Sequence, residues 1–274
     1  MPKRALLVYK CLFKKFINKE LEKYFMVEAD YGKISQIYDY LRAVETQGLT
    51  KADGAFVFGR ADPRIADRTY TLFRNELIDY AMISGGIGKD SGALERLELP
   101  EAEYLAARLR WTHGVQDDKL LVESFASNGG ENSRFGIQNI LNSGRAHDNL
   151  IMVAHSTSLR RLWASHLVEA EKMGFEANYQ LRGSEYDFDP RNLNDRNEAV
   201  TELIRLAVWP EKKWSKEQED LPLDLGEYAK DYLKDQLEEV AQIKMNFEEL
   251  LSGGSYRIKE SPGRLDIYID LISR

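Results

Sequence analysis

The stretch of sequence that decides the fold reads DGAFVFGRADP at residues 53–63. The apolar run at residues 55–58 is continuous, which is typical of a strand buried on both faces in a parallel sheet. Gly59 ends this run. Asp62 and Pro63 then open a helix, because aspartate caps free N–H groups and proline at the first helical position loses no hydrogen bond. The stretch therefore predicts a strand, a short loop and a helix in succession.

The same alternation continues outward in both directions. Before the stretch, apolar residues at helical spacing predict a helix over 32–48, with Gly48 as its natural stop. Parallel strands need crossover connections, and the later helices supply them. The sequence therefore predicts an α/β fold, namely a three-layer αβα, Rossmann-like and mostly parallel sheet with helical N- and C-terminal additions. The further elements that we expect are strands at 80–83, 119–122, 150–154 and 177–181, and helices that begin at Pro100, Glu131 and Leu159.

The 274 residues of the chain allow one or two domains, at roughly 150 residues per domain. Strands and crossover helices fill 51–210, which we assign to the α/β domain. The flanking parts are a helical segment over 1–50, which starts with a basic amphipathic helix at 1–25, and a helical extension over 211–274. Within that extension we expect a polar linker at 211–224, a long amphipathic helix at 228–251 and a candidate edge strand at 265–270.

Composition argues against several classes of function. Acidic residues outnumber basic ones by 45 to 38, giving a formal net charge of −7. Sequence-blind nucleic-acid binding needs a positive surface that releases counterions, so we expect no nucleic-acid partner. No apolar run reaches the 18 residues of a membrane span, so we expect no stable membrane insertion. The single cysteine, Cys11, excludes an internal disulfide and a cysteine-rich zinc site, and is compatible with a cytoplasmic location.

Ligands of an open α/β sheet bind beyond the carboxyl ends of the strands. Applied to the predicted strands, this rule selects four loops that are rich in glycine, small polar residues and charge. The loops lie at 59–64, 84–91, 123–132 and 155–161. In the first loop, the candidate ligand-binding residues are Gly59, Arg60 and Asp62.

The second loop follows a strand and is rich in glycine, which favours a nucleotide-binding interpretation. A P-loop, however, would need glycine at position 83 and serine or threonine at 90, where the chain has Ile83 and Asp90. A dinucleotide fingerprint would need glycine or alanine in place of Ser91. The loop is thus either a plain tight turn or a backbone whose N–H groups suit an anion or a ribose. Its candidate ligand-binding residues are Ser84, Gly85, Gly86 and Gly88.

The third loop carries two carboxylates, Glu123 at the end of a strand and Glu131 near a helix N-terminus. Such a pair can perform acid/base chemistry or bind the hydroxyl groups of a ligand, and both are candidate catalytic residues. Glu131 and Asn132 can equally cap the free N–H groups of the helix. The candidate ligand-binding residues of this loop are Asn128, Gly130 and Asn132.

The fourth loop begins with His155, which directly follows a buried strand and therefore points toward the shared cleft. His155 is a candidate general base, and equally a hydrogen-bonded structural group. Thr157 and Arg161 are candidate ligand-binding residues, since arginine binds phosphate and carboxylate. Arg160 and Arg161 point about 100° apart on a helix, so we expect the other arginine to be a solvated surface charge. The four histidines show no metal-ligand spacing, and no metal is implied.

Taken together, these loops resemble the YdcF-like family, also called the DUF218 domain or the SanA/ElyC/YdcF family. The resemblance covers about residues 52–170 and is closest to the cytoplasmic YdcF type. The chain departs from many members at Ser158, where they have a histidine before the arginine. The matching pieces follow the family order: FGRADPR at 58–64, ISGGIG at 83–88, EAE at 101–103, Gly114-Val115, Glu123 with SNGGEN at 127–132, and the strand-to-helix element at 153–161.

The resemblance implies a Rossmann-like αβα domain with a smaller helical C-terminal part. It also implies binding of S-adenosylmethionine, with which the YdcF type is associated, or of another small anionic or nucleotide-like ligand. In this hypothesis the glycines of the second loop let the ligand approach the backbone, and Glu123 or Glu131 holds hydroxyl groups. Asn132 then orients the site, and Arg161 binds an anionic end.

Two alternatives stay open, and with them the question of whether the protein is an enzyme. The first is a hydrolase or transferase that acts on a phosphorylated or sugar-linked envelope precursor, with the acidic pair and the arginine as working groups. The second is a non-catalytic regulatory binding protein whose long C-terminal helix is a partner surface.

Overall fold

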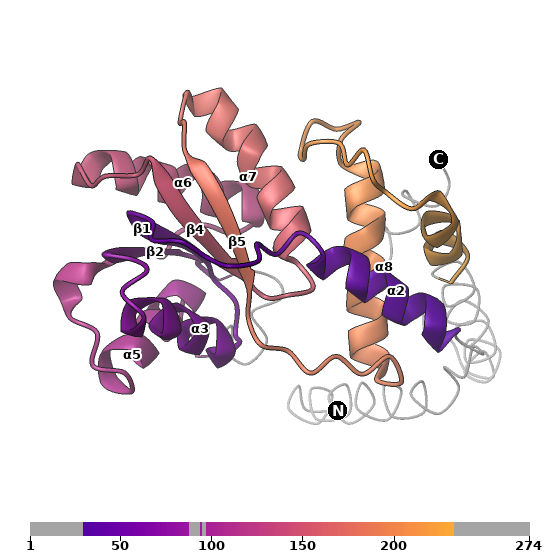
Figure 1. Ribbon diagram of the computed structural model, residues 1–274, viewed down its shortest axis with the longest axis horizontal. Coiled ribbons are helices and arrows are strands. Elements are labelled where there is room, and N and C mark those ends of the chain that lie inside the picture. Colours follow the sequence, from indigo (N-terminus) through magenta and orange to yellow (C-terminus); the bar gives the residue numbers. More distant parts are fainter. Residues whose placement is uncertain (1–29, 88–93, 95–96, 233–274) are drawn as a thin grey trace, which may run out of the picture.

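The computed structural model describes residues 30–87, 94 and 97–232. Within these residues five parallel strands form one sheet in the order β3-β2-β1-β4-β5 (Figure 1), which confirms the predicted Rossmann-like α/β fold. The strand order reverses between β1 and β4, so the topological switch point lies at their carboxyl ends. The strands are β1 (Gly54–Phe58), β2 (Tyr80–Ser84), β3 (Leu120–Glu123), β4 (Asn149–Ala154) and β5 (Asn178–Gly183).

Helices cover both faces of this sheet and give the fold its three layers (Figure 1). Phe56 and Val57, neighbours in β1, are buried in two different hydrophobic cores on opposite faces, as the alternation of side chains along a strand requires. The core of Val57 contains residues of α3 and α5, and that of Phe56 contains residues of α6 and α7. The four helices are α3 (Pro63–Arg74), α5 (Glu101–Trp111), α6 (Gly129–Ser143) and α7 (Leu159–Met173).

The starts of these helices follow from their capping residues. Asp62 accepts a hydrogen bond of 3.0 Å from the backbone N–H of Arg64, and Pro63 is the first residue of α3. Asn128 accepts from the N–H of Glu131 at 3.0 Å and caps α6. The sequence-based prediction of a helix after Asp62 is therefore confirmed.

A third hydrophobic cluster lies beyond the carboxyl ends of the strands. It joins α2 (Tyr31–Arg42), α8 (Leu193–Val208), the helical residues 223–232 and Ala164 of α7. Figure 1 shows α2 and α8 beside the sheet domain rather than over either face. Segments that precede and follow the sheet in the sequence therefore pack on one another.

Two helix predictions need correction. The helix expected over 32–48 ends at Arg42. The backbone N–H of Thr46 donates to Leu181 of β5 and the Leu181 N–H donates to the Thr46 hydroxyl, both at 2.9 Å. Gly48 lies in the turn that follows, with a φ of +65°.

The second correction is an omission, because the sequence analysis predicted no helix where the structure has α8. The expected linker over 211–224 also ends early, because helical residues begin at 223. The predicted helix at 1–25, the predicted edge strand at 265–270 and the part of the 228–251 helix beyond 232 lie outside the described residues, as does Gly88.

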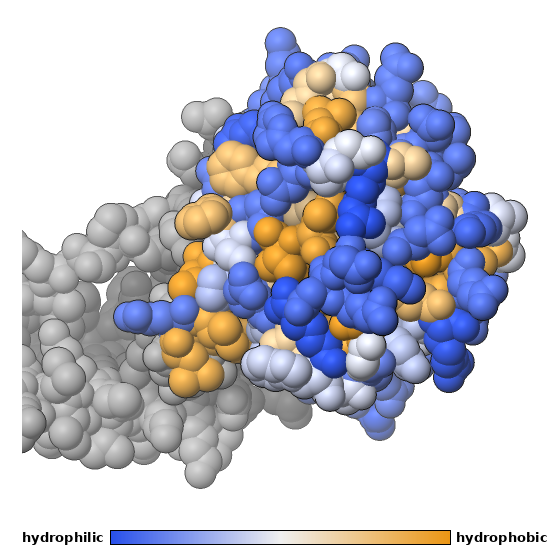
Figure 2. Space-filling view, turned by 90° about the vertical axis from the view of Figure 1, so that its left-hand side faces the viewer, coloured by the Kyte–Doolittle hydropathy of each residue, from blue (hydrophilic) through white to orange (hydrophobic). Residues whose placement is uncertain are grey.

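Figure 2 views the side of the α/β layers that faces away from α2 and α8. On this face hydrophobic residues form small groups among hydrophilic ones. In the portion of the chain that the structure describes, no helix combines the length and the apolar character needed to cross a membrane.

Candidate functional site

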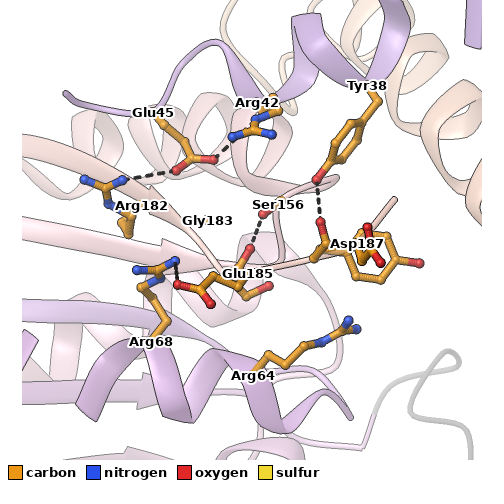
Figure 3. Close-up of a pocket in the computed structure, with 12 residues that line it drawn as sticks. Tyr38, Arg42, Glu45, Arg64, Arg68, Ser156, Arg182, Gly183, Glu185 and Asp187 are labelled. Atoms are coloured by element: carbon orange, nitrogen blue, oxygen red, sulfur yellow. Dashed lines mark hydrogen bonds and ion pairs between the residues drawn. The ribbon is translucent and has the colours of Figure 1, made fainter. Parts of the chain in front are cut away.

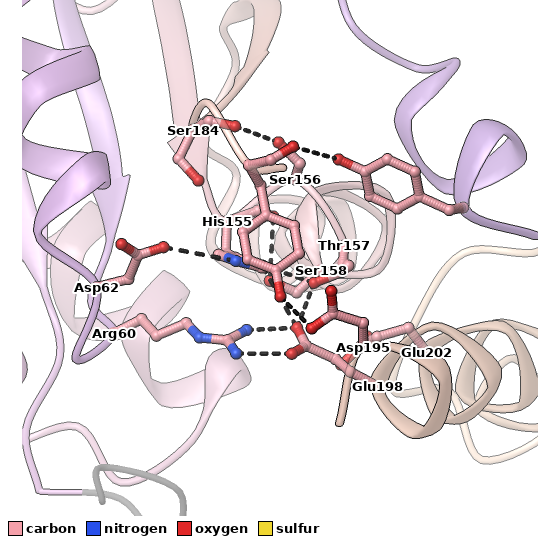
Figure 4. A network of polar contacts seen from close by, with 12 residues as sticks. Arg60, Asp62, His155, Ser156, Thr157, Ser158, Ser184, Asp195, Glu198 and Glu202 are labelled. Atoms are coloured by element: carbon pink, nitrogen blue, oxygen red, sulfur yellow. Dashed lines mark hydrogen bonds and ion pairs between the residues drawn. The ribbon is translucent and has the colours of Figure 1, made fainter. Parts of the chain in front are cut away.

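The loops that follow β1 and β4 meet at the switch point and contact α8 (Figure 4). Arg60, just after β1, makes a two-pronged ion pair with Glu198 of α8, with N–O distances of 2.5 and 2.7 Å. The hydroxyl of Thr157 donates to the same carboxylate. His155 places Nδ1 2.6 Å from the Thr157 hydroxyl and 3.3 Å from Glu198 Oε1. The structure thus brings together three predicted site residues around a carboxylate that the sequence analysis did not include.

Electrostatics hold this ion pair in its charged form. Burial alone raises the pKa of Glu198, but hydrogen bonds from Arg60 and His155 outweigh burial and keep it well below the ordinary value. Burial alone lowers the pKa of Arg60, and its hydrogen bonds to Glu198 raise it above the ordinary value. The carboxylate of Glu198 is therefore ionised at neutral pH.

His155 is enclosed by its surroundings. Its side chain is 2% exposed, and its ring meets the ring of Tyr186 edge to face at 4.5 Å between centroids. Nε2 lies 3.5 Å from Asp62 Oδ2, while Nδ1 contacts Thr157 and Glu198. Both ring nitrogens thus face partners within the chain, which favours the structural interpretation of His155 over that of a general base.

The two carboxylates of the third loop are engaged by their own loop. The hydroxyl of Ser84 donates to Glu123 Oε2 at 2.6 Å, and the N–H groups of Phe125 and Ala126 donate to Oε1. Glu131 accepts from the hydroxyl and the N–H of Ser127, which lowers its pKa. Glu123 therefore ties the loop after β3 to the end of β2. Glu131 is an ionised side chain that accepts hydrogen bonds from Ser127, so it is poorly suited to donating a proton.

Glycine is required in these loops because the loops pack closely on one another. A Cβ on Gly59 would lie 2.8 Å from the Cα of Gly85, and one on Gly86 would lie 2.4 Å from the carbonyl oxygen of Ala126. Both distances are too short for a side chain. Loop packing alone thus accounts for these three glycines, whereas a Cβ on Gly130 would approach nothing closer than 3.4 Å.

Arg161 belongs to the first turn of α7, and its guanidinium reaches the beginning of α6. Its Nε and Nη2 donate to Glu202 of α8, whereas Nη1 donates to no residue that the structure describes. Nη1 lies 3.5 Å from the position that a Cβ would occupy on Gly129, the first residue of α6. A guanidinium group and the positive end of a helix dipole therefore converge at this place.

Donors and an acceptor accompany this arginine. The N–H groups of Gly129 and Gly130 have no acceptor among the described residues, whereas those of the next two residues bond to Asn128. Asn132, in the first turn of α6, is 7% exposed, and its Oδ1 has no partner in the described part of the chain. The first turn of α6 thus contains two N–H donors and one buried acceptor that lack partners among the described residues.

Arg160 differs from the expectation of a solvated charge. It is 5% exposed, its guanidinium lies 3.9 Å from the centroid of the Tyr40 ring, and it pairs with Asp220 at 2.9 Å. Arg160 therefore holds the segment after α8 against α2, and only its neighbour Arg161 turns toward the strand ends.

Sequence reasoning missed Glu198 and Glu202 because it assigned no element to the residues of α8. The signal was present: Asn192 is a good N-cap, and apolar residues recur at helical spacing in positions 199, 200, 203 and 206. The helix alone would not have revealed the pairing with Arg60 and Arg161, which joins segments far apart in the sequence.

The described residues contain no group of three or more histidine, cysteine, aspartate or glutamate side chains that is arranged to hold a metal ion.

Comparison with known proteins does not assign the chain to a family. No family model matches the chain, and no curated protein matches it.

Proposed function

We propose that this chain is a cytoplasmic, YdcF-like protein that binds a small anionic, nucleotide-like molecule at the carboxyl ends of its strands. The observation that carries the proposal is the meeting of Arg161 with the N-terminus of α6. Charge-assisted hydrogen bonds from a guanidinium and from helix N–H groups are a common way in which proteins hold carboxylate or phosphate. The position beyond the strand ends is where Rossmann-like sheets bind their ligands.

S-adenosylmethionine is the candidate that the family resemblance suggests, and the residues present fit its amino-acid end. Its carboxylate would accept from Arg161 Nη1 and from the N–H groups of Gly129 and Gly130. Its ammonium group would donate to Asn132 Oδ1, the buried acceptor that has no partner in the described part of the chain. The proposal concerns binding, because the side chains of Glu123, Glu131 and His155 are engaged within the chain.

Thermal unfolding with and without ligand tests the proposal. A ligand at 100 times its Kd stabilises a protein by about 2.7 kcal/mol, which shifts the midpoint measurably. We expect S-adenosylmethionine, S-adenosylhomocysteine or a nucleotide to produce this shift. If none of them shifts the midpoint, the proposal is wrong.

The matched variant is Arg161→Gln combined with Glu202→Gln, which removes both members of the buried pair. Arg205, which also pairs with Glu202, is partly exposed, so its charge stays in contact with solvent. The control is Arg110→Gln, which removes a peripheral arginine paired with the exposed Asp117. We expect the shift to disappear in the double variant and to persist in the control. A shift that survives in the double variant would place the ligand elsewhere.

A further inference from the structure

A second pocket, of about 490 Å³, opens beyond the carboxyl ends of β4 and β5 (Figure 3). Residues of α2 and α3 and the segment 182–187 line it. Tyr186 lines this pocket and also meets His155 at the switch point, so the tyrosine lies between the two regions. The pocket contains neither Arg161 nor any residue of α6, and it is therefore distinct from the site proposed above.

Four arginines from three elements surround the pocket. The three acidic residues among the lining residues are Glu45, Glu185 and Asp187, so positive groups outnumber negative ones. Figure 3 shows Arg42 and Arg182 on either side of Glu45, with Arg64 on the opposite side of the pocket. The four arginines are Arg42 of α2, Arg64 and Arg68 of α3, and Arg182 of β5.

Arg64 is held by a short ion pair of 2.8 Å with the buried Asp62. The ion pairs of the other three arginines are long or exposed. Arg42 and Arg182 share the single carboxylate of Glu45 at 4.0 and 3.5 Å. Arg68 pairs at 2.7 Å with Glu185, whose side chain is 85% exposed. Exposed and long pairs contribute little to stability, in contrast to the two-pronged pair at the switch point. The guanidinium groups other than that of Arg64 therefore retain capacity for a further anion.

Two residues that line the pocket carry buried donors without a partner among the described residues. Ser184 is 3% exposed, and its hydroxyl makes no hydrogen bond with the described residues. The Nε–H of Arg68 is likewise buried and unpaired in that part of the chain. Buried donors without acceptors are uncommon in proteins and call for an explanation such as an ordered water or a bound ion.

We propose that this pocket is a second ligand site, which takes a small phosphate monoester of the size of a sugar phosphate. A phosphate monoester offers three acceptor oxygens and nearly two negative charges, which suits several guanidinium forks. The volume exceeds what a bare phosphate needs, and Tyr38 and Tyr186 supply an amphipathic wall for an attached sugar.

Isothermal titration of the full chain with glucose 6-phosphate is the test, with glucose as the unphosphorylated control at equal ionic strength. We expect glucose 6-phosphate to bind, inorganic phosphate to compete with it, and glucose not to bind. Absence of binding, or equal binding of glucose, would overturn the proposal.

Variants locate the site. Arg68→Gln and Arg182→Gln should each weaken binding at least tenfold, and Arg68→Lys should weaken it less, since lysine keeps the charge but loses the fork. Arg74→Gln, in the last turn of the same helix α3, should bind as the wild type does. Unchanged circular dichroism shows that each variant is folded.

The two proposed sites are distinguished by the Arg161→Gln, Glu202→Gln double variant, which should bind glucose 6-phosphate normally. If the double variant loses this binding while Arg68→Gln and Arg182→Gln retain it, the phosphate belongs to the α6 site and the second-site proposal is overturned.

Discussion

At the scale of single residues, two carboxylates of α8 form ion pairs with the arginines of the candidate site. Glu202 accepts from Nε and Nη2 of Arg161 and also from Arg205 at 2.8 Å. Glu198 accepts from Arg60 in the same way, one helical turn away on α8. An anion that reaches Arg161 therefore has to share its guanidinium with a carboxylate of the chain.

This arrangement predicts that Glu202→Gln strengthens ligand binding. Loss of the charge weakens the competing hydrogen bonds to Arg161, and hydrogen bonds that involve a charged group contribute about 1.5–3 kcal/mol. We expect the Kd of the anionic ligand to fall about tenfold by titration calorimetry. Glu171→Gln, which removes a surface carboxylate paired with Lys216, is the control and should leave the Kd unchanged. An unchanged or higher Kd for Glu202→Gln would contradict the assignment of Arg161.

The depressed pKa of Glu198 predicts how stability depends on pH. In the unfolded chain a glutamate titrates near pH 4.3, whereas in the folded chain the pKa lies lower, so the folded state favours the ionised form. The contribution of Glu198 is fully present above the unfolded pKa and is lost as pH falls toward the folded pKa.

We therefore expect Glu198→Gln to lower the free energy of unfolding at pH 7 by about 1–2 kcal/mol, less than the 3–5 kcal/mol of a fully buried pair because the Arg60 side chain is 38% exposed. Urea unfolding at pH 7 and pH 3 measures this difference. The difference in the free energy of unfolding between variant and wild type should be smaller at pH 3 than at pH 7. A larger difference at pH 3 would contradict the ionised state of Glu198.

At the scale of secondary-structure elements, close packing places α6 against the sheet. A Cβ on Gly136 would lie 2.5 Å from the ring of Phe56, the central residue of β1. This contact sets how near the N-terminus of α6 comes to the strand ends, and thus where its free N–H groups lie.

Gly136→Ala therefore reverses the usual effect of alanine in a helix. Alanine normally stabilises a helix by about 1 kcal/mol over glycine, but overpacking a core costs about 1–3 kcal/mol. We expect a net loss of stability in chemical denaturation. Gly130→Ala makes the same exchange in the same helix, where a Cβ meets nothing closer than 3.4 Å, and should cost less than Gly136→Ala. Equal losses of stability for the two substitutions would show that overpacking against Phe56 does not cause the loss.

Elements with local signals could be predicted from the sequence, and elements that depend on distant partners could not. The buried run of β1 and the cap at Asp62 lie within a few residues of one another, so the strand, loop and helix there are predictable. The end of α2 at Arg42 depends on bonds between Thr46 and Leu181, which are 135 residues apart.

The same reason limits prediction of the candidate site. The rule that ligands bind beyond strand ends selected loops that do lie together in the structure. The side chains that engage those loops come from α8, and Arg60 and Glu198 are separated by 138 residues. Pairings of this kind follow from the tertiary fold and not from the spacing of residues in the sequence.

At the scale of the whole molecule, the charge is unevenly distributed. The chain carries a formal net charge of −7, yet arginines gather at the carboxyl ends of the strands, both at the α6 site and in the pocket beyond β4 and β5. Local positive regions attract anions even when the overall charge is negative. The helices α2 and α8 flank this end of the sheet and contribute to the pocket and to the switch-point network, respectively.

The most direct test of the central claim is to follow the backbone amides of Gly129 and Gly130 by nuclear magnetic resonance during titration with S-adenosylmethionine. We expect these two signals to shift with ligand concentration, because their N–H groups bind the anionic end. Gly114 and Gly174, which lie in turns after α5 and α7, should not move. Binding that leaves the signals of Gly129 and Gly130 unchanged would contradict the account.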